Sequence, residues 1–349
     1  MTLEPGSLRT PLCGLLGCEY PVILAGMGGV ARAELAAAVA NAGGFPTLGM
    51  VREAPSLIAS EIRAYRRLAD RSFAVNLIPA ATDPDLLNQQ IDTCLSHDVK
   101  VFSFFWDVVP AIVARVKEAG CQVLYQVGTE RAAQEAEAAG ADVLIAQGQE
   151  AGGHVHGQTG TFDLTRSLID NFDLPVVASG GISTGDGLSR ALYLGAQGIQ
   201  CGTAFLATEE SFAHDYHKQR IVAAEAQHTV LTDGFVLNWP RGSAVRVLQN
   251  SVTAAFGTEL MGHDPDTIPR DVIAHDVDLP RLRQSTDSPL RTSSGNLEAM
   301  ALYAGQGVGE IRDIPAAGEL LNRVVRQACR SLESMPDFGE FTRSAAWNP

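Results

Sequence analysis

The amino-acid sequence predicts an α/β protein, a (β/α)8 TIM barrel with an inserted, mainly helical second domain. Two observations lead to this fold class. Between residues 21 and 205, short apolar runs alternate eight times with alanine-rich stretches of helical periodicity. After residue 207 the alternation stops, and longer helical stretches follow. The expected barrel therefore comprises residues 1–207 and 301–349, with residues 208–300 inserted as a substrate or lid domain.

Eight predicted strands are rich in apolar and β-branched residues. They span residues 21–26, 44–50, 72–78, 99–106, 122–127, 141–148, 174–180 and 198–205. Uniformly apolar strands indicate burial on both faces, as in a parallel sheet covered by helices. An open, doubly wound sheet would give the same alternation, so the count of eight decides for a closed barrel.

The segments between these strands have the spacing and the ends of helices. In ARAELAAAVANAG and TERAAQEAEAAGA the apolar residues recur at helical spacing, and a glycine follows as the stop. Short strand-helix-strand connections imply right-handed crossovers and parallel pairing. Residues 310–335 again predict a capped amphipathic helix, the last outer helix of the barrel. The insertion would then interrupt the eighth βα unit.

Composition limits the kind of protein this is. The chain has 349 residues, 46% of them hydrophobic, which is enough for a large core. Its formal charge of −14 argues against a nucleic-acid partner. No run of 18 apolar residues occurs, so we expect a soluble, cytoplasmic protein with no membrane partner. The six cysteines are scattered without a CxxC pair, which favours reduced thiols over disulfides or zinc.

Glycines follow the seventh and eighth predicted strands, in ASGGIST and QCGTAFLAT. In a (β/α)8 barrel the active site lies at the C-terminal ends of the strands, and a phosphate commonly binds after strands seven and eight. Glycine lets backbone N–H groups approach a phosphate closely. We therefore predict that Gly180, Gly181, Gly202 and Thr203 hold a phosphate. The alternative is that the glycines only permit tight turns.

Two histidines lie in the segment AQGQEAGGHVHG, residues 146–157, which begins at the end of the sixth predicted strand. His154 could act as a general base, because an unperturbed imidazole titrates near neutral pH. The alternative is a hydrogen-bonded structural histidine. His156 has a weaker claim, and a metal pair is disfavoured because no third ligand is near.

Other residues have two readings each. Phe104, Phe105 and Trp106, at the end of the fourth predicted strand, either wall the pocket or pack in the core. The neighbouring Asp107 is either an acid or a helix N-cap. Lys218, in ESFAHDYHKQ, is assigned no chemistry.

Five strings along the chain resemble the nitronate monooxygenase family, formerly called 2-nitropropane dioxygenases. They are YPVILAGMGGV, AQGQEAGGH, VVASGGI, LGAQGIQCGTAFLATEES and ALYAGQGVGEIR. They occur in the family's order, and the resemblance extends from about residue 10 to about residue 330. It implies an FMN-bound barrel with a helical second domain. It also makes His154 the counterpart of the catalytic histidine in the family's EAGGH motif.

The same resemblance implies a set of FMN-binding residues. Carried over position by position, they are Ala25, Gly26, Met27, Asn76, Gln126, Gln147, Gly152, Gly153, Ser179, Gly180, Gly181, Gly202, Thr203, Tyr303, Gly305, Gln306 and Gly307. Tyr303 departs from the pattern, since many relatives have other residues there. The glycines overlap with the phosphate site predicted from the turns alone.

The function that the resemblance implies is an FMN-dependent nitronate monooxygenase. Such an enzyme oxidises alkyl nitronates, or nitroalkanes, with O2 to carbonyl compounds and nitrite, without a metal, and here His154 would be the base. A homodimer is one candidate assembly. The alternative is an NAD(P)H-dependent FMN reductase acting on quinones or enoyl thioesters, like the family's enoyl-ACP reductase relatives. A third hypothesis is a non-catalytic, flavin-storing barrel.

Overall fold

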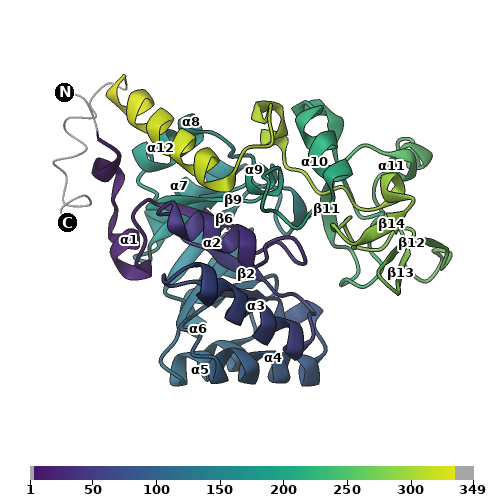
Figure 1. Ribbon diagram of the computed structural model, residues 1–349, viewed down its shortest axis with the longest axis horizontal. Helices are drawn as coiled ribbons and strands as arrows, with labels where there is room; N and C mark the ends of the chain where they lie inside the picture. The colour runs from purple at the N-terminus through teal and green to yellow at the C-terminus, as the bar shows by residue number, and fades with distance from the viewer. Residues whose placement is uncertain (1–3, 335–349) are drawn as a thin grey trace.

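Eight parallel strands form the centre of the molecule. A computed structural model describes residues 4–334 of the chain (Figure 1). The strands are β1 Val22–Leu24, β2 Thr47–Gly49, β3 Ala74–Leu77, β4 Val101–Phe105, β5 Gln122–Val127, β6 Val143–Gln147, β8 Val176–Ser179 and β9 Gly198–Cys201. Neighbouring strands pair in the order β1-β9-β8-β6-β5-β4-β3-β2. Each predicted strand contains one of them.

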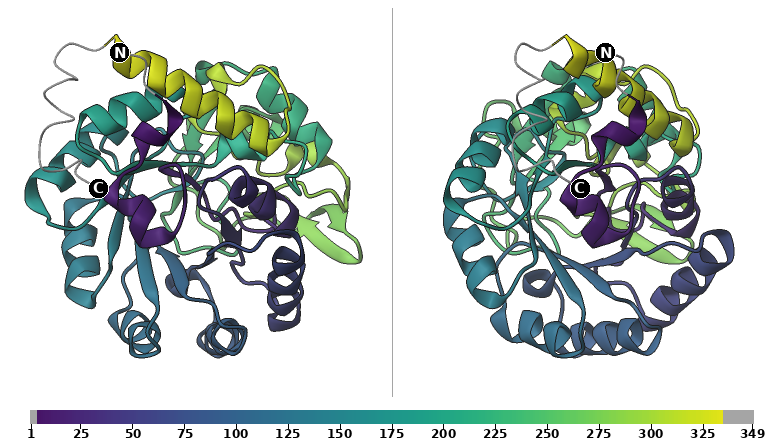
Figure 2. Two further views of the ribbon diagram at one scale, coloured as in Figure 1. Left: turned by 60° about the vertical axis from the view of Figure 1, so that its left-hand side comes forward. Right: turned by 90° about the vertical axis from the view of Figure 1, so that its left-hand side faces the viewer.

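The two ends of this sheet meet and close it into a barrel. Near β1 and β2, Ile23 and Phe45 form a parallel bridge. The N–H of Leu24 donates to the carbonyl of Phe45 at 2.9 Å, and the N–H of Phe45 donates to the carbonyl of Val22 at 2.9 Å. Figure 2 shows the closed ring of strands with helices outside it. The predicted (β/α)8 barrel is confirmed.

The eighth predicted strand needs one correction. Residues 198–205 were expected to be extended, but β9 ends at Cys201 and Thr203–Leu206 form the short helix α9. Gly202 is the turning point, because its φ of −107° and ψ of −72° leave the extended region. The carbonyl of Gly202 accepts from the N–H of Leu206 at 2.9 Å, which begins the helix.

Helices cover the outside of the barrel. They are α2 Ala33–Asn41, α3 Pro55–Leu68, α4 Pro84–Ser96, α5 Pro110–Glu118, α6 Glu130–Ala139, α7 Thr161–Asn171, α8 Gly185–Tyr193 and α12 Ala317–Glu333. Local sequence explains their ends. Helix α6 starts where the Thr129 hydroxyl accepts from the N–H of Ala132 and stops at Gly140, which has φ 102°. Among the described helices, none is long and apolar enough to cross a membrane.

The predicted last helix is α12, which packs against α8 and α2. Its N-cap residue, Ala316, makes no side-chain cap. Instead Glu210, distant in the chain, accepts from the N–H of Ala317 at 2.8 Å, so the cap is a tertiary contact. The backbones of α8 and α12 lie so close that a Cβ on Gly185 would be 2.3 Å from the carbonyl oxygen of Val324. Residues 335–349, assigned to the barrel by prediction, lie outside the described residues.

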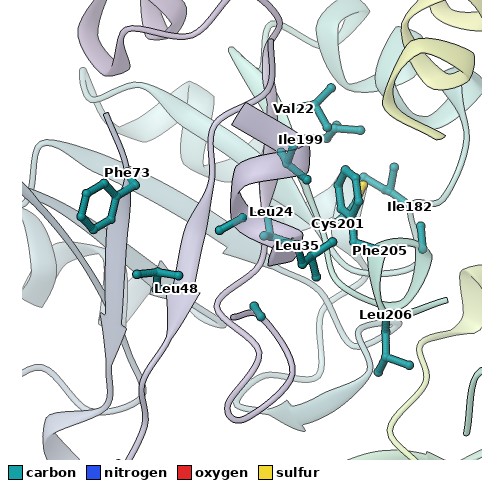
Figure 3. Packing of buried hydrophobic residues seen from close by; sticks show 14 of the residues in the cluster. Val22, Leu24, Leu35, Leu48, Phe73, Ile182, Ile199, Cys201, Phe205 and Leu206 are labelled. Atoms are coloured by element: carbon teal, nitrogen blue, oxygen red, sulfur yellow. The ribbon is translucent and has the colours of Figure 1, made fainter. Parts of the chain in front are cut away.

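The largest hydrophobic cluster lies between the strands and the outer helices. Leu24 of β1, Leu35 of α2 and Phe205 of α9 belong to it and are fully buried (Figure 3). A second cluster joins Leu12 and Leu16 of helix α1, Pro11–Leu16, to the first residues of several strands. Helix α1 therefore covers the N-terminal end of the barrel and leaves the C-terminal end for a site.

The inserted segment lies at the C-terminal end of the barrel strands (Figure 1). Its residues line a cavity together with residues from those strand ends. The expectation of a mainly helical insertion needs correction. Besides the helices α10 Asp215–Val222 and α11 Ser251–Phe256, it contains the strands β10 Thr229–Thr232, β11 Ala244–Leu248, β12 Val272–Asp276, β13 Leu279–Leu282 and β14 Ser293–Gly295. These strands belong to two small antiparallel sheets.

The error has a local cause. The stretch SAVRVLQNSVTAAF, residues 243–256, reads as one helix but divides at Asn250. Val245 and Val247 are β-branched, fully buried and paired in a sheet, which favours a strand. The Asn250 side chain then accepts from the N–H groups of Val252 and Thr253 and starts α11.

Candidate active site

A cavity of about 510 Å³ lies between the C-terminal ends of the barrel strands and the inserted segment. Every predicted site residue lines this cavity except Gln306. The backbone N–H of Gln306 donates to the carbonyl of Glu150 at 2.9 Å, and its side chain is exposed to solvent. The structure therefore brings the predicted site together and leaves out one residue of it.

The turn after β1 forms part of the cavity wall and lies very close to β3. Gly26 follows β1, and a Cβ built on it would lie 2.2 Å from the Cβ of Asn76, which belongs to β3. Any larger residue would push these two strand ends apart. The segment Ala25–Met27 can thus form a flat wall, with the N–H of Ala25 bonded to the carbonyl of Cys201 at 2.9 Å.

The predicted phosphate site is a hollow lined by backbone. Gly180 and Gly181 have φ values of 110° and 67°, the left-handed region that residues with a Cβ rarely adopt. Gly307 packs against this turn so closely that a Cβ there would lie 2.6 Å from the carbonyl oxygen of Gly181. The Thr203 hydroxyl accepts from the N–H of Gly305 at 3.0 Å and ties the same late loop to α9.

Buried amide side chains also line the cavity. Asn76 donates to the carbonyl of Ser103 at 3.0 Å, and Gln147 donates to the carbonyl of His154 at 2.9 Å. Their oxygens Oδ1 and Oε1 are buried and accept nothing from the described residues. A buried acceptor without a donor costs about 1–3 kcal/mol. Two such oxygens in one cavity indicate a ligand that carries N–H or O–H donors.

One residue that the sequence did not point to completes this group. Gln200 of β9 donates to Gln126 Oε1 at 2.6 Å and to the Ser179 hydroxyl at 3.2 Å. These bonds hold Gln126 and Ser179 at the mouth of the barrel. In the sequence Gln200 lies between Ile199 and Cys201, with no glycine or histidine directly next to it. Its position near the end of a predicted strand was the only sign that it could belong to the site.

His154 is held by aromatic rings. It lies on strand β7, Gly153–Val155, which pairs with β11 of the insertion so that His154 faces Val245. Its ring stacks on Trp239 with centroids 3.4 Å apart and planes 17° apart, and the edge of Trp106 meets it at 6.1 Å. Its Nε2 is buried and has no partner among the described residues.

The charge state of His154 follows from these surroundings. Burial lowers the pKa of His154 well below 6.5, and the positive charge of Arg52 lowers it further. The imidazole is therefore neutral at pH 7 and keeps a free lone pair. A neutral imidazole on a cavity wall can accept a proton from a bound carbon acid.

His156 has different surroundings. It does not line the cavity, and its Nε2 lies 3.5 Å from Asp107 Oδ1. Asp107 is not the N-cap of α5, whose cap residue is Val109. Of the aromatic residues with two readings, Phe104 is in the core and Phe105 lines the cavity. The ring of Trp106 lies against both histidines.

Tyr303 and its neighbours are positioned from the insertion. The Tyr303 hydroxyl donates to the carbonyl of Thr286 at 2.7 Å, so it is already used within the protein. His217 of α10 is fully buried, and its Nε2 lies 3.0 Å from the carbonyl of Tyr303. Burial lowers the pKa of His217 to about 4, so the ring is neutral and its N–H donates to that carbonyl. Lys218 lies outside the cavity and donates to the carbonyl of Glu209 at 3.2 Å.

The pKa of His217 predicts that stability falls in mild acid. Below pH 6.5 the unfolded chain binds a proton at this residue, whereas the folded protein does so only near pH 4. Stability is therefore lost as pH falls through 6.5, and His217 alone should remove about 2 kcal/mol of unfolding free energy between pH 7 and pH 5. His217→Gln should flatten this dependence in urea denaturation at several pH values. The exposed His275→Gln should leave it unchanged, and an unaltered slope in His217→Gln would contradict the assignment.

Within the described residues, no group of three or more His, Cys, Asp or Glu side chains is arranged to hold a metal ion. The fold is that of a (β/α)8 barrel, and the similar proteins described below place the chain among the flavin-dependent oxidoreductases. The family model described as nitronate monooxygenase matches residues 9–327, and the chain belongs to that family.

Two curated relatives and two solved structures show the range of similar proteins. The chain is 32% identical to an octahydro-indene-carboxyl-CoA dehydrogenase of Rhodococcus jostii, over 94% of this chain and 98% of the relative. It is also 32% identical to a nitronate monooxygenase of Paraburkholderia phytofirmans, over 97% and 100%. The structure of FabK from Thermotoga maritima has a TM-score of 0.78 at 28% identity, covering 93% of this chain and 97% of that one. A nitroalkane oxidase from Streptomyces ansochromogenes has a TM-score of 0.75 at 30% identity, covering 93% and 99%.

Proposed function

We propose that the protein is an FMN-dependent nitronate monooxygenase, which oxidises alkyl nitronates or nitroalkanes with O2 to carbonyl compounds and nitrite. The observation that carries this proposal is the imidazole of His154, a residue of the cavity wall, which is neutral and stacks on Trp239. Family membership and the likeness to a nitroalkane oxidase support it.

The cavity suits FMN in two respects. The turn at Gly180 and Gly181 would receive the phosphate, because left-handed glycines expose backbone N–H groups without side chains. The buried oxygens of Asn76 and Gln147 would accept from the imide N–H of the flavin ring or from ribityl hydroxyls. Bound FMN would supply electron transfer to O2, which amino-acid side chains cannot perform.

His154 would act on the carbon next to the nitro group. A ring nitrogen of its neutral imidazole would take the proton of a neutral nitroalkane and leave the nitronate anion. Stacking on Trp239 and the edge of Trp106 hold the imidazole plane, so the lone pair keeps one direction. A positioned general base of this kind typically contributes about 10²- to 10⁴-fold to the rate. A substrate supplied as the preformed nitronate would not need this step.

A second candidate is an NAD(P)H-dependent FMN reductase that acts on quinones or enoyl thioesters. Similar proteins that are not called nitronate monooxygenases favour it, because FabK and the CoA dehydrogenase each align with more than nine-tenths of this chain. The same glycine turn and amides would hold FMN for either reaction. The two functions differ in the electron donor, which is the nitronate in one and the nicotinamide in the other.

One experiment separates the two candidates. The purified protein should show a flavin absorbance spectrum, and chromatography after denaturation should identify the flavin as FMN. We expect oxygen uptake and nitrite release with alkyl nitronates in the absence of NADH. If NADH bleaches the flavin under anaerobic conditions and no nitronate gives oxygen uptake, the reductase is the correct function.

A further inference from the structure

We infer that Arg52 binds the anionic group of the substrate, so that the cavity selects compounds with a planar, two-oxygen anion such as a nitronate or a carboxylate. The inference rests on the proposed function and assigns the preference for a negatively charged substrate to one residue. Arg52 follows β2 in the chain and lines the cavity.

Neutral groups hold the Arg52 guanidinium in place. It donates to the carbonyl of Asn238 at 2.6 Å and to the Thr286 hydroxyl at 3.1 Å. Both acceptors come from the insertion and neither carries a charge. A guanidinium has five N–H donors, so three remain after these two bonds. The remaining donors match the two oxygens of a carboxylate or nitronate, which arginine binds in a bidentate way.

The other arginine on the cavity wall shows the contrast. Arg281 lies 3.0 Å from Asp276 Oδ2 and 3.1 Å from Asp287 Oδ1, so its charge is already balanced. Within residues 4–334 no carboxylate lies within 4.0 Å of the Arg52 guanidinium nitrogens. The neighbouring Glu53 also lines the cavity, but the charges acting on its carboxylate come from Arg32, Arg281, Asp276 and Glu61. A partly buried charge without a counter-ion is unfavourable, and an anionic ligand would relieve it.

The backbone indicates that this arrangement is imposed by the fold. Arg52 has φ 56° and Asn238 has φ 72°, both in the left-handed region. That region is disfavoured for most residues with a Cβ, including arginine, whereas asparagine tolerates it. The hydrogen bonds to Asn238 and Thr286 direct the guanidinium toward the insertion side of the cavity.

Arg52 also lies close to the proposed base. Its guanidinium carbon is 5.9 Å from the ring centroid of Trp239, and Trp239 stacks on His154. The charge of Arg52 is felt at His154, whose pKa it lowers. When a nitroalkane loses its proton to the His154 imidazole, the C–H electron pair forms the C=N bond and the negative charge moves to the two oxygens. Arg52 would bind that charge while His154 holds the proton.

The inference is tested by binding rather than by turnover. The probe is isobutyrate, a planar carboxylate close in size to propane-2-nitronate, and isobutyramide is its neutral match. Calorimetric titration of the flavin-loaded protein should give a higher affinity for isobutyrate. Arg52→Gln keeps hydrogen-bond donors without the charge and should weaken isobutyrate binding at least about tenfold, while isobutyramide binding changes less than about twofold. Arg52→Lys should recover part of the affinity.

The matched control is Arg281→Gln, which removes the same charge from the same cavity. It should lower isobutyrate affinity less than Arg52→Gln does, because Arg281 is held by Asp276 and Asp287 and offers a ligand no unpaired charge. Equal losses in Arg52→Gln and Arg281→Gln would overturn the inference, as would a wild-type protein that binds both probes equally. A failure of the proposed function looks different, because wild-type protein would then bind isobutyrate and give no oxygen uptake with nitronates.

Discussion

Replacing His154 by alanine should lower turnover of a neutral nitroalkane by about 10²- to 10⁴-fold, with turnover of the preformed nitronate changed less than about tenfold. Only the neutral substrate needs its proton removed, and the neutral imidazole of His154 is the base we propose for it. Because the pKa of His154 lies well below 6.5, kcat/KM for the nitroalkane should not decline as pH falls from 8 to 6.5. Oxygen uptake with both substrate forms measures the contrast.

The control for this experiment is His156→Ala. His156 lies on the same segment and its ring also contacts Trp106, but it does not line the cavity. It should leave both rates within about threefold of wild type. Because alanine at position 154 also removes the stacking partner of Trp239, His154→Asn should be measured beside it. If His154→Ala and His154→Asn each lose as much turnover with the nitronate as with the nitroalkane, His154 is not the base.

Replacing Gly202 by alanine should weaken FMN binding roughly ten- to a hundredfold, because the added methyl group would crowd the phosphate and weaken a charged hydrogen bond to it. The φ of Gly202 is −107°, and a negative φ is not reserved for glycine. A Cβ there would lie 3.6 Å from the Ala25 Cβ and 3.7 Å from the Met27 Sδ, both ordinary contacts. The protein should therefore fold normally, with the new methyl group among residues of the cavity wall.

Titration of the flavin-free protein with FMN and with riboflavin tests this reading. Riboflavin lacks the phosphate, so its affinity should change less than about threefold in Gly202→Ala. Gly14→Ala is the matched control, because a Cβ at Gly14 of α1 meets nothing within 4 Å and lies at the other end of the barrel. If FMN and riboflavin lose affinity equally, Gly202 does not face the phosphate.

Local sequence predicted the strands of the barrel well, because burial on both faces restricts them to apolar residues. It also predicted the glycine turns and His154 at the cavity, and the family resemblance supplied the other predicted residues. Parallel strands in a barrel place their C-terminal ends at one rim, so residues after Leu24, Leu77 and Ser179 must meet there. Gln306 is the exception, because the bond from its N–H to Glu150 turns that residue outward.

The insertion was predicted less well. Its strands are short and partly exposed, and their pairing partners lie far away in the chain. Strand β7 shows the difficulty, since it pairs with β11 only after the barrel has brought the two together. The position of Trp239 over His154 depends on that pairing, and no spacing in the sequence indicates it.

The sequence alone determined the barrel, the glycine turns and the histidine after the sixth barrel strand, because each depends on local conformation and on strand order. Only the tertiary structure decided what surrounds them. It placed Trp239 against the imidazole, left the oxygens of Asn76 and Gln147 without donors, and set Arg52 on the cavity wall without a carboxylate. These features arise from contacts between distant segments, and the burial and charge of a side chain depend on all its neighbours in space.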